Sequence, residues 1–212
     1  MIIVAISGGT GSGKTTLAKK IINSYKNFSV NYISLDSYYK DFSELSFANR
    51  SKINFDHPNS IDFELFYQQI SDYINGNNIK TPIYSYKSHK RLKKKGSLKQ
   101  GDLLIVDGIL ILLKKSIRDF FDLSIFLKVN SSERLRRRIV RDINERGRNE
   151  IEIKNRFYKM IKPMHDRYVK SSEKFADIVL DESYVFDDIK ICLLYTSPSP
   201  RDLLKSRMPS SA

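Results

Sequence analysis

The sequence has a single cysteine, Cys192, in 212 residues, so no internal disulfide can form. It also lacks the basic N-terminal region of a secretory signal peptide, because an apolar segment begins at Met1. Together these two absences predict a cytoplasmic protein.

Long hydrophobic runs and internal repeats are also absent. No apolar run approaches the roughly 20 residues that a membrane-spanning helix needs, so we expect no membrane partner. The hydrophobic content of 41% and the chain length suit one domain with a full-sized core.

Acidic residues are scarce, with 24 Asp and Glu against 37 Lys and Arg, which gives a net charge of +13. Three interpretations are open: a nucleic-acid surface, a solvated basic surface, or an enzyme for polyphosphate substrates. No nucleic-acid-binding module is recognisable, so we expect no nucleic-acid partner.

What the chain does contain is a glycine-rich segment that fits the phosphate-binding pattern G-x-x-x-x-G-K-[ST]. An apolar run precedes it and a helical pattern follows, which is the context that such a loop needs. Glycines let successive backbone N–H groups point at phosphate oxygens, and the helix N-terminus favours anions. The residues predicted to bind the donor nucleotide here are Gly8, Gly9, Thr10, Gly11, Ser12, Gly13, Lys14, Thr15 and Thr16.

Two acidic residues end predicted strands. Asp36 follows the strand 30–35, and Asp107 follows the buried strand 103–106. Ligands of open α/β sheets lie beyond the carboxyl ends of the strands, so both acids are expected near the loop. Asp36 would accept a proton from an attacking hydroxyl or help to hold Mg²⁺, unless it only caps the next turn. Thr15, Asp36 and Asp107 are the predicted metal ligands.

Strand and helix patterns alternate along the chain, which predicts an α/β fold whose mostly parallel central sheet is covered by helices on both faces. Residues 62–75 and 150–169 read as helices. Residues 81–86 and a partner near 97–99 read as a β-hairpin, with Lys93–Gly96 near its tip.

The segment from Ser132 to Arg148 is dense in arginine. Arg134, Arg138 and Arg141 share one helical face, and guanidinium groups suit phosphate oxygens. We interpret the segment as a lid that closes over ATP, the alternatives being a solvated helix face or an RNA contact.

Several motifs in order resemble the uridine–cytidine kinase family, most closely its bacterial form. The phosphate loop is common to many families, but the segments NFDHP and RDINERGR are far more discriminating. The motifs are Gly8–Thr15, DSYY at 36–39, NFDHP at 54–58, PIY at 82–84, SHKR at 88–91, DGIL at 107–110, RDINERGR at 141–148 and KPMH at 162–165.

The resemblance covers about residues 1–182 and implies a P-loop kinase fold with a β-hairpin and an arginine-rich lid, in a domain that we expect to span residues 1–191. Residues 192–212, rich in Ser and Pro, read instead as a non-native or disordered tail. The family resemblance further implies ATP, or GTP, as phosphoryl donor with Mg²⁺, and uridine and cytidine as substrates. It also implies a homo-oligomer, specifically a homotetramer.

The resemblance also assigns roles to individual residues. Asp36 matches the general base, and Asp56 matches the carboxylate that holds the two ribose hydroxyls. Tyr84 and His89 match the pair that contacts the pyrimidine. The catalytic set is Asp36, Lys14 and Arg141; Arg141 and Arg146 join the donor site, and Arg138 and Arg148 join the substrate site.

The chain departs from the family at three places. Asp107 stands where the family usually has Glu, Arg156 stands at a substrate-contacting glutamine, and Asp181–Tyr184 replace a basic, glycine-containing segment. The run Lys90–Lys95 matches no functional position and is expected to be solvated.

Three rival functions fit part of the sequence. Phosphoribulokinase or pantothenate kinase would share the loop, but the NFDHP segment argues against both. A GTPase would need an [NT]-K-x-D segment after a strand, which is absent. A nucleic-acid-binding protein would show binding that weakens steeply with salt.

Overall fold

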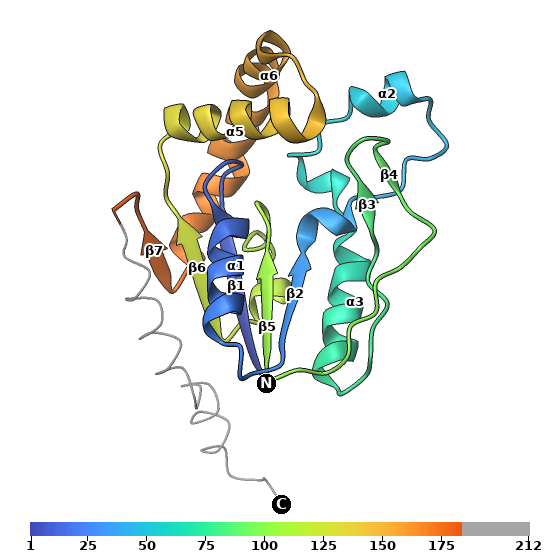
Figure 1. Cartoon of the computed structure of the whole chain (residues 1–212), viewed down its shortest axis with the longest axis vertical. Coiled ribbons are helices and arrows are strands. Elements are labelled where there is room, and N and C mark those ends of the chain that lie inside the picture. The colour runs from blue at the N-terminus through green and yellow to red at the C-terminus, as the bar shows by residue number, and fades with distance from the viewer. Residues whose placement is uncertain (184–212) are drawn as a thin grey trace, which may run out of the picture.

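The computed structural model describes residues 1–183, and a five-stranded parallel sheet forms its centre (Figure 1). The strand order is β2-β5-β1-β6-β7, with all neighbouring pairs parallel. The strands are β1 (Ile2–Gly8), β2 (Val30–Ser34), β5 (Leu103–Asp107), β6 (Leu123–Leu127) and β7 (Ile178–Leu180). The predicted parallel α/β sheet is therefore confirmed.

The central strands are apolar on both faces because helices cover both faces. Along β1, Ile3 and Ala5 join the larger core cluster, whereas Val4 and Ile6 join a second cluster with Leu17 of α1 (Lys14–Ser24). Successive side chains of a strand point to opposite faces, so one strand serves both cores. The larger cluster takes in α3 (Phe63–Ile74), whose N-cap Asp62 accepts a hydrogen bond from the Leu65 N–H.

The predicted hairpin exists, but its register is different. Strand β3 (Tyr84–Ser85) pairs with β4 (Lys90–Arg91), and an isolated bridge joins Ile79 to Leu98. The tip therefore lies at residues 86–89 and not at Lys93–Gly96. Arg91 holds the hairpin to the core, because it donates to the Tyr39 carbonyl at 2.6 Å and pairs with Asp62 at 3.0 Å. Within the run Lys90–Lys95, which was expected to be solvated, Lys93–Lys95 are exposed, whereas Arg91 is half-buried and holds the hairpin in place.

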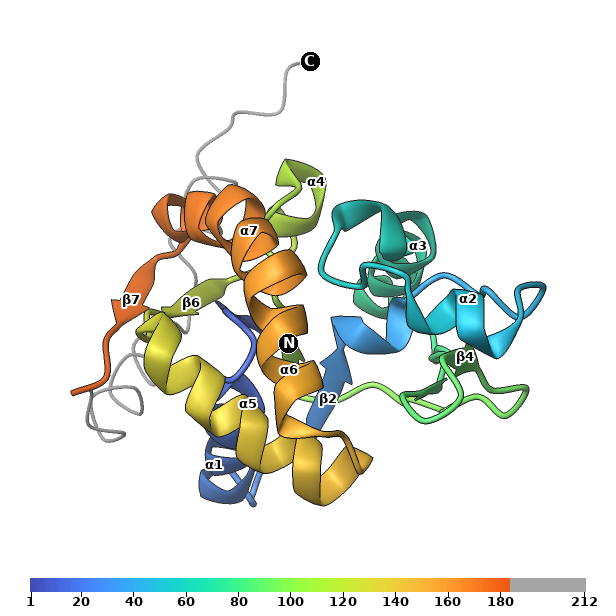
Figure 2. The same cartoon turned by 90° about the horizontal axis from the view of Figure 1, so that it is seen from above.

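Two helices lie over the carboxyl ends of the strands, as Figure 2 shows from above. They are α5 (Ser131–Arg146) and α6 (Glu150–Arg156), and Leu135 of α5 packs with Ile153 and Phe157 in a small separate core. The predicted helix 150–169 is confirmed as a continuous helical stretch that runs to Phe175.

This long helix contains two wide π-helical turns, at Phe157–Ile161 and His165–Val169, on either side of α7 (Lys162–Met164). The Lys162 N–H reaches back to the Phe157 carbonyl, five residues earlier. Pro163 lacks an N–H, and its ring would crowd the preceding turn of a regular helix. The wider turn before it relieves that crowding.

The remaining α-helices of the described residues are the short α2 (Phe47–Ser51) and α4 (Lys115–Arg118), and two 3-10 helices span Leu35–Tyr38 and Pro58–Ser60. Within residues 1–183, no helix is both long and apolar enough to cross a bilayer. The predicted tail, 192–212, lies outside the described residues, as does Tyr184 of the third departure.

Candidate active site

The phosphate loop connects β1 to α1, as the sequence predicted. Gly13 serves as the N-cap of α1 in a left-handed conformation, with φ of 98°, and Gly11 has φ of 77°. L-residues with side chains rarely adopt such angles, so glycine is required at both positions. Thr16 lies exposed in the first turn of α1. The loop thus meets a helix N-terminus, where backbone N–H groups have no partner within the helix.

Lys14 and Thr15 lie beside the end of β5. The Lys14 ammonium donates to the Gly9 carbonyl at 3.0 Å, and the Thr15 hydroxyl donates to Asp107 at 2.9 Å. Burial lowers the pKa of Lys14, against the opposing effect of Asp107 and Asp36. The sheet order explains the contact, because β1 and β5 are neighbours and their carboxyl ends coincide.

The residues predicted to hold Mg²⁺ offer one hydroxyl and two carboxylates. These oxygen donors suit Mg²⁺, which keeps much of its coordination for phosphate and water oxygens. Consistent with so sparse a set, residues 1–183 contain no group of three or more His, Cys, Asp or Glu side chains arranged for a metal. Burial, with Asp107 nearby, raises the pKa of Asp36, while Lys14 opposes this.

A cavity of about 70 Å³ lies next to the loop and collects most of the predicted substrate and lid residues. Its lining comes from segments far apart in the sequence, which meet where β2, β5, the hairpin and α5 come together. The lining residues are Thr10, Asp36, Tyr39, Phe55, Asp56, Tyr84, Tyr86, His89, Ile109, Arg138, Arg141, Arg146, Arg148 and Arg156. Tyr39, Phe55, Tyr86 and Ile109 had no predicted role, although each lies within or beside a quoted motif.

Aromatic rings form one wall of the cavity. His89 stacks on Phe55 with ring centroids 5.2 Å apart and planes at 10°, and Tyr84 meets Tyr39 edge-on at 5.1 Å. His89 has a φ of 51°, in the hairpin turn. Burial, then Arg148 and Arg156, lowers the pKa of His89, so its imidazole is neutral at neutral pH. A neutral imidazole can donate through one nitrogen and accept through the other.

Two polar groups of the cavity are poised for a ligand. Burial raises the pKa of Asp56, although Arg138 and Arg156 act against this. The buried Tyr84 hydroxyl has no hydrogen-bond partner among residues 1–183. A buried polar group without a partner is costly, and a bound molecule that pairs with it removes that cost.

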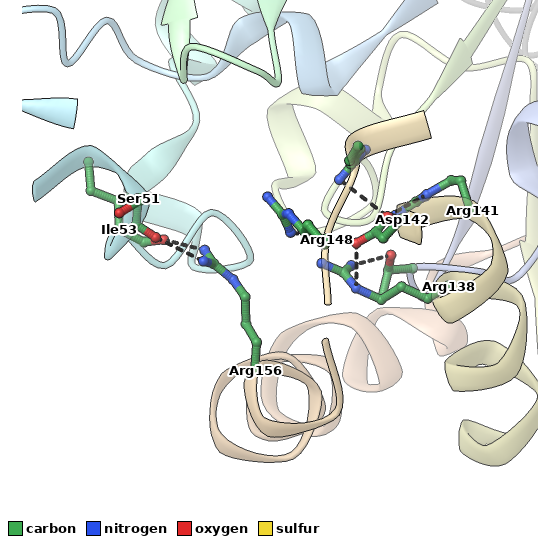
Figure 3. Close-up of polar contacts among 9 residues, drawn as sticks. Ser51, Ile53, Arg138, Arg141, Asp142, Arg148 and Arg156 are labelled. Carbon is green, nitrogen blue, oxygen red and sulfur yellow. Dashed lines mark hydrogen bonds and ion pairs between the residues drawn. The ribbon is translucent and has the colours of Figure 1, made fainter. Parts of the chain in front are cut away.

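Asp142, which the sequence analysis did not single out, organises the arginines of α5 (Figure 3). Its carboxylate is fully buried and lies 2.7 Å from Arg141, 3.4 Å from Arg138, 3.5 Å from Arg148 and 3.6 Å from Arg146. Burial would raise the pKa of Asp142, but Arg138, Arg141 and Arg146 outweigh it and lower that pKa. One carboxylate therefore holds four arginines at the cavity rim.

Arg156 connects α6 to the segment that follows α2 (Figure 3). Its guanidinium donates to the Ser51 carbonyl at 2.8 Å and to the Ile53 carbonyl at 2.9 Å. Arg156 also lines the cavity, together with Phe55 and Asp56. The sequence shows that Arg156 replaces a glutamine of the family. It does not show which carbonyl groups the arginine contacts.

Tyr86 connects the hairpin to both Asp36 and Arg146. Its hydroxyl donates to Asp36 at 3.3 Å, and the Arg146 guanidinium lies over its ring at 4.5 Å from the centroid. The hairpin thus contacts both the predicted base and an arginine of α5.

The sequence model of the phosphoribulokinase/uridine kinase family matches residues 3–187. The chain belongs to this family. A protein named uridine kinase from Clostridium novyi (strain NT) is 41% identical over 181 residues, which cover 85% of this chain and 87% of that protein. A uridine kinase from Clostridium perfringens is 40% identical over the same shares of the two chains.

Solved structures of more distant proteins share the fold. A possible uridine kinase from Bacillus stearothermophilus has a TM-score of 0.60 and 20% identity, covering 85% of this chain and 88% of that one. Phosphoribulokinase from Rhodobacter spheroides has a TM-score of 0.63 and 13% identity, covering 85% and 69%. The P-loop kinase fold is therefore confirmed, and the phosphoribulokinase rival lies within the same family.

Proposed function

We propose that this protein transfers the γ-phosphoryl group of ATP to the 5′-hydroxyl of uridine and cytidine, giving UMP and CMP. The observation that carries the proposal is the cavity beside the phosphate loop, where Asp36, Asp56, Tyr84 and His89 meet under the α5 arginines. The relatives named uridine kinase, at about 40% identity, support uridine as a substrate.

On the donor side, the loop binds the phosphates and Lys14 leaves the Gly9 carbonyl to reach the transferred group. Thr15 and Asp107, with Asp36 near, would hold Mg²⁺, which neutralises phosphate charge when bound. Arg141 and Arg146 offset the charge that develops on the transferring phosphoryl group. Catalysis is then mainly positioning and charge stabilisation.

On the acceptor side, Asp36 accepts the proton of the 5′-hydroxyl as its oxygen bonds to the γ-phosphorus and the bond to ADP breaks. Asp56 accepts hydrogen bonds from the two ribose hydroxyls, a match of two oxygens to a cis-diol. Tyr84 and the neutral His89 contact the pyrimidine, and Arg138 and Arg148 complete the substrate site.

The test is ATP-dependent phosphorylation of a panel of nucleosides by the purified protein. Uridine and cytidine should be good acceptors, 2′-deoxynucleosides poor ones, and purine nucleosides inactive, because a site built to bond a hydroxyl penalises its loss. Ribulose 5-phosphate serves as the acceptor of the rival family activity. Equal use of deoxycytidine, adenosine or ribulose 5-phosphate would overturn the proposal.

We propose three accompanying properties with separate tests. The donor is ATP, with GTP compared in the same assay. The protein is cytoplasmic, which fractionation of the source cells would test. It forms a homotetramer, which light scattering of the purified protein would test.

A further inference from the structure

Arg134 is an arginine of α5 that lies almost completely out of contact with solvent. It is only 2% exposed and is the largest fully buried side chain among the described residues. Its Nε donates to the Val129 carbonyl at 3.1 Å, and its guanidinium lies 5.8 Å from the centre of the Phe157 ring. Neither contact supplies a negative charge.

The charge of Arg134 has no close counter-ion. None of the ion pairs within residues 1–183 involves Arg134, and its Nη1 atom has no hydrogen-bond partner there. Asp166 and Asp56 act on its charge only from farther away. A buried charge without a partner is strongly unfavourable, so this arrangement calls for a compensating anion.

The position of Arg134 indicates where that anion binds. A Cβ atom added at Gly9 would overlap the Arg134 guanidinium, and one added at Gly11 would overlap the Arg134 carbonyl oxygen. The Arg134 side chain therefore packs directly against Gly9, and its backbone packs against Gly11. One turn along α5, Arg138 donates to the Thr10 hydroxyl at 2.8 Å, which fixes the helix against the loop.

Apart from the more distant Asp166 and Asp56, the ionisable groups around Arg134 within residues 1–183 do not offset its charge. His165, from the long helix, lies close enough to Arg134 and Lys14 for both charges to act on its pKa, and its buried Nδ1 also has no partner among the described residues. Burial, then Arg134, lowers the pKa of His165 to about 4, so the imidazole is neutral and adds no cation. Lys14 carries the same sign as Arg134.

We propose that Arg134 is a phosphate-positioning residue: a buried cation, packed against Gly9 and Gly11, whose counter-ion is the polyphosphate of the donor nucleotide. The proposal deepens the donor site and rests on the proposed function for the identity of that donor. Arg134 acts through the loop backbone by its electric field. It therefore adds to phosphate affinity without contacting a nucleoside, and it makes the free protein less stable than it would be with an apolar residue there.

The experiment compares R134M, R134K and the matched control R136M in the full-length protein. Arg136 lies on the same helix but is 68% exposed and paired with Glu133, away from the loop. For each protein, calorimetry gives the Kd for Mg–ATP and for magnesium tripolyphosphate, and thermal denaturation gives Tm with and without ligand. Uridine phosphorylation by the wild type is measured in parallel.

For R134M we expect affinity for ATP and tripolyphosphate to fall on the order of tenfold or more, since a cation several ångströms from phosphate is lost. The Tm of ligand-free R134M should equal or exceed that of the wild type, because an uncompensated buried charge is gone. R134K, which keeps a positive charge, should retain most of the affinity, and R136M should match the wild type throughout.

Three results would overturn the proposal: R134M binding tripolyphosphate as tightly as the wild type, R134K losing as much affinity as R134M, or R134M lowering the Tm of the free protein or failing to fold. The last would make Arg134 a packing residue only. A wild type that binds tripolyphosphate through Arg134 yet phosphorylates no uridine would overturn the proposed function and leave this assignment supported.

Discussion

The donor and acceptor sides of the site are built in different ways. The donor side is one short loop plus the ends of adjacent strands, and its Lys14 and Thr15 already have protein partners at Gly9 and Asp107. The acceptor side draws Asp56, Tyr84 and Arg156 from segments far apart in the sequence.

The two sides therefore differ in how many of their polar groups already have a partner before a ligand binds. On the donor side, Lys14 and Thr15 can bind phosphate by exchanging existing hydrogen bonds for new ones, while the buried Arg134 gains an anion. In the acceptor cavity, a substrate would complete the Tyr84 hydroxyl, which has no partner among the described residues, and the two carboxylates whose pKa is raised. We therefore expect donor-side changes to affect turnover most, and acceptor-side changes to affect substrate selection.

Replacing Lys14 with alanine should give the largest effect. Loss of the cation that follows the transferred phosphoryl group should lower kcat by about 10³-fold. Uridine affinity, measured by calorimetry, should stay within about threefold, because the acceptor side is separate. Lys19→Ala, on the exposed face of α1, is the matched control. Retention of a tenth of the activity by folded Lys14→Ala would contradict the phosphate-loop assignment.

Asp36→Asn tests the residue at the boundary between the two sides. The amide keeps the shape but cannot accept the proton, so kcat should fall by about 10² or more while ATP binding persists. Because the pKa of Asp36 is raised and its ionised form is the active one, wild-type kcat should fall as the pH drops through that raised pKa. Near-normal kcat for Asp36→Asn would show that Asp36 only caps a turn.

Asp56→Ala addresses the acceptor side alone. The kcat/KM for uridine should fall by roughly 10- to 100-fold, with a smaller loss for 2′-deoxyuridine, so the preference for ribose narrows. The measurement is kcat/KM for both nucleosides at saturating ATP. An unchanged ratio between the two would show that Asp56 does not hold the diol.

Arg156→Gln should give a moderate effect. Removing the bonds to the Ser51 and Ile53 carbonyls should raise the KM for uridine several-fold, roughly 3- to 10-fold, with little change in the KM for ATP. Amide hydrogen exchange should also speed up in α2. The control is Lys154→Gln on the same helix, whose one ion pair within residues 1–183 is with Glu150. Equal exchange in Arg156→Gln and wild type would show that the arginine does not restrain α2.

Tyr86→Phe should give the smallest effect. The ring still lies under Arg146, but the hydroxyl that favours ionised Asp36 is lost, so the pKa of Asp36 rises. The acid limb of the pH–kcat profile should then move to higher pH by roughly half a unit or less. Tyr86→Leu removes ring and hydroxyl together and separates the two contributions. A profile for Tyr86→Phe that overlays the wild type would contradict the Tyr86–Asp36 link.

Local patterns predicted the sheet, the loop and the helix positions, because periodicity and glycine spacing are fixed by neighbouring residues. The parallel sheet then follows, since β1 and β5 carry Lys14 and Asp107 to the same edge. The family resemblance predicted Asp56, Tyr84 and His89, which the structure gathers around one cavity, although their roles remain predictions.

Long-range features could not be predicted in this way. The hairpin register depends on the contacts of Arg91 with Tyr39 and Asp62. The hydrogen bonds of Arg156 depend on carbonyl groups more than 100 residues earlier in the sequence. Asp142 reads as one more charge in a helix until the fold encloses it. Each case requires a contact that no local pattern specifies.

The two wide turns of the long helix also limit where the sequence can gain or lose a residue. Each residue of a regular helix turns the chain by about 100°, so deleting one residue between Phe157 and Ile161 would rotate His165 and Val169 relative to Arg156. Arg156 bonds to the Ser51 and Ile53 carbonyls, and His165 lies near the charges of Arg134 and Lys14, so both residues could not keep their places. A substitution changes the contacts of one side chain, whereas a single-codon insertion or deletion would uncouple the two sides of the site at once.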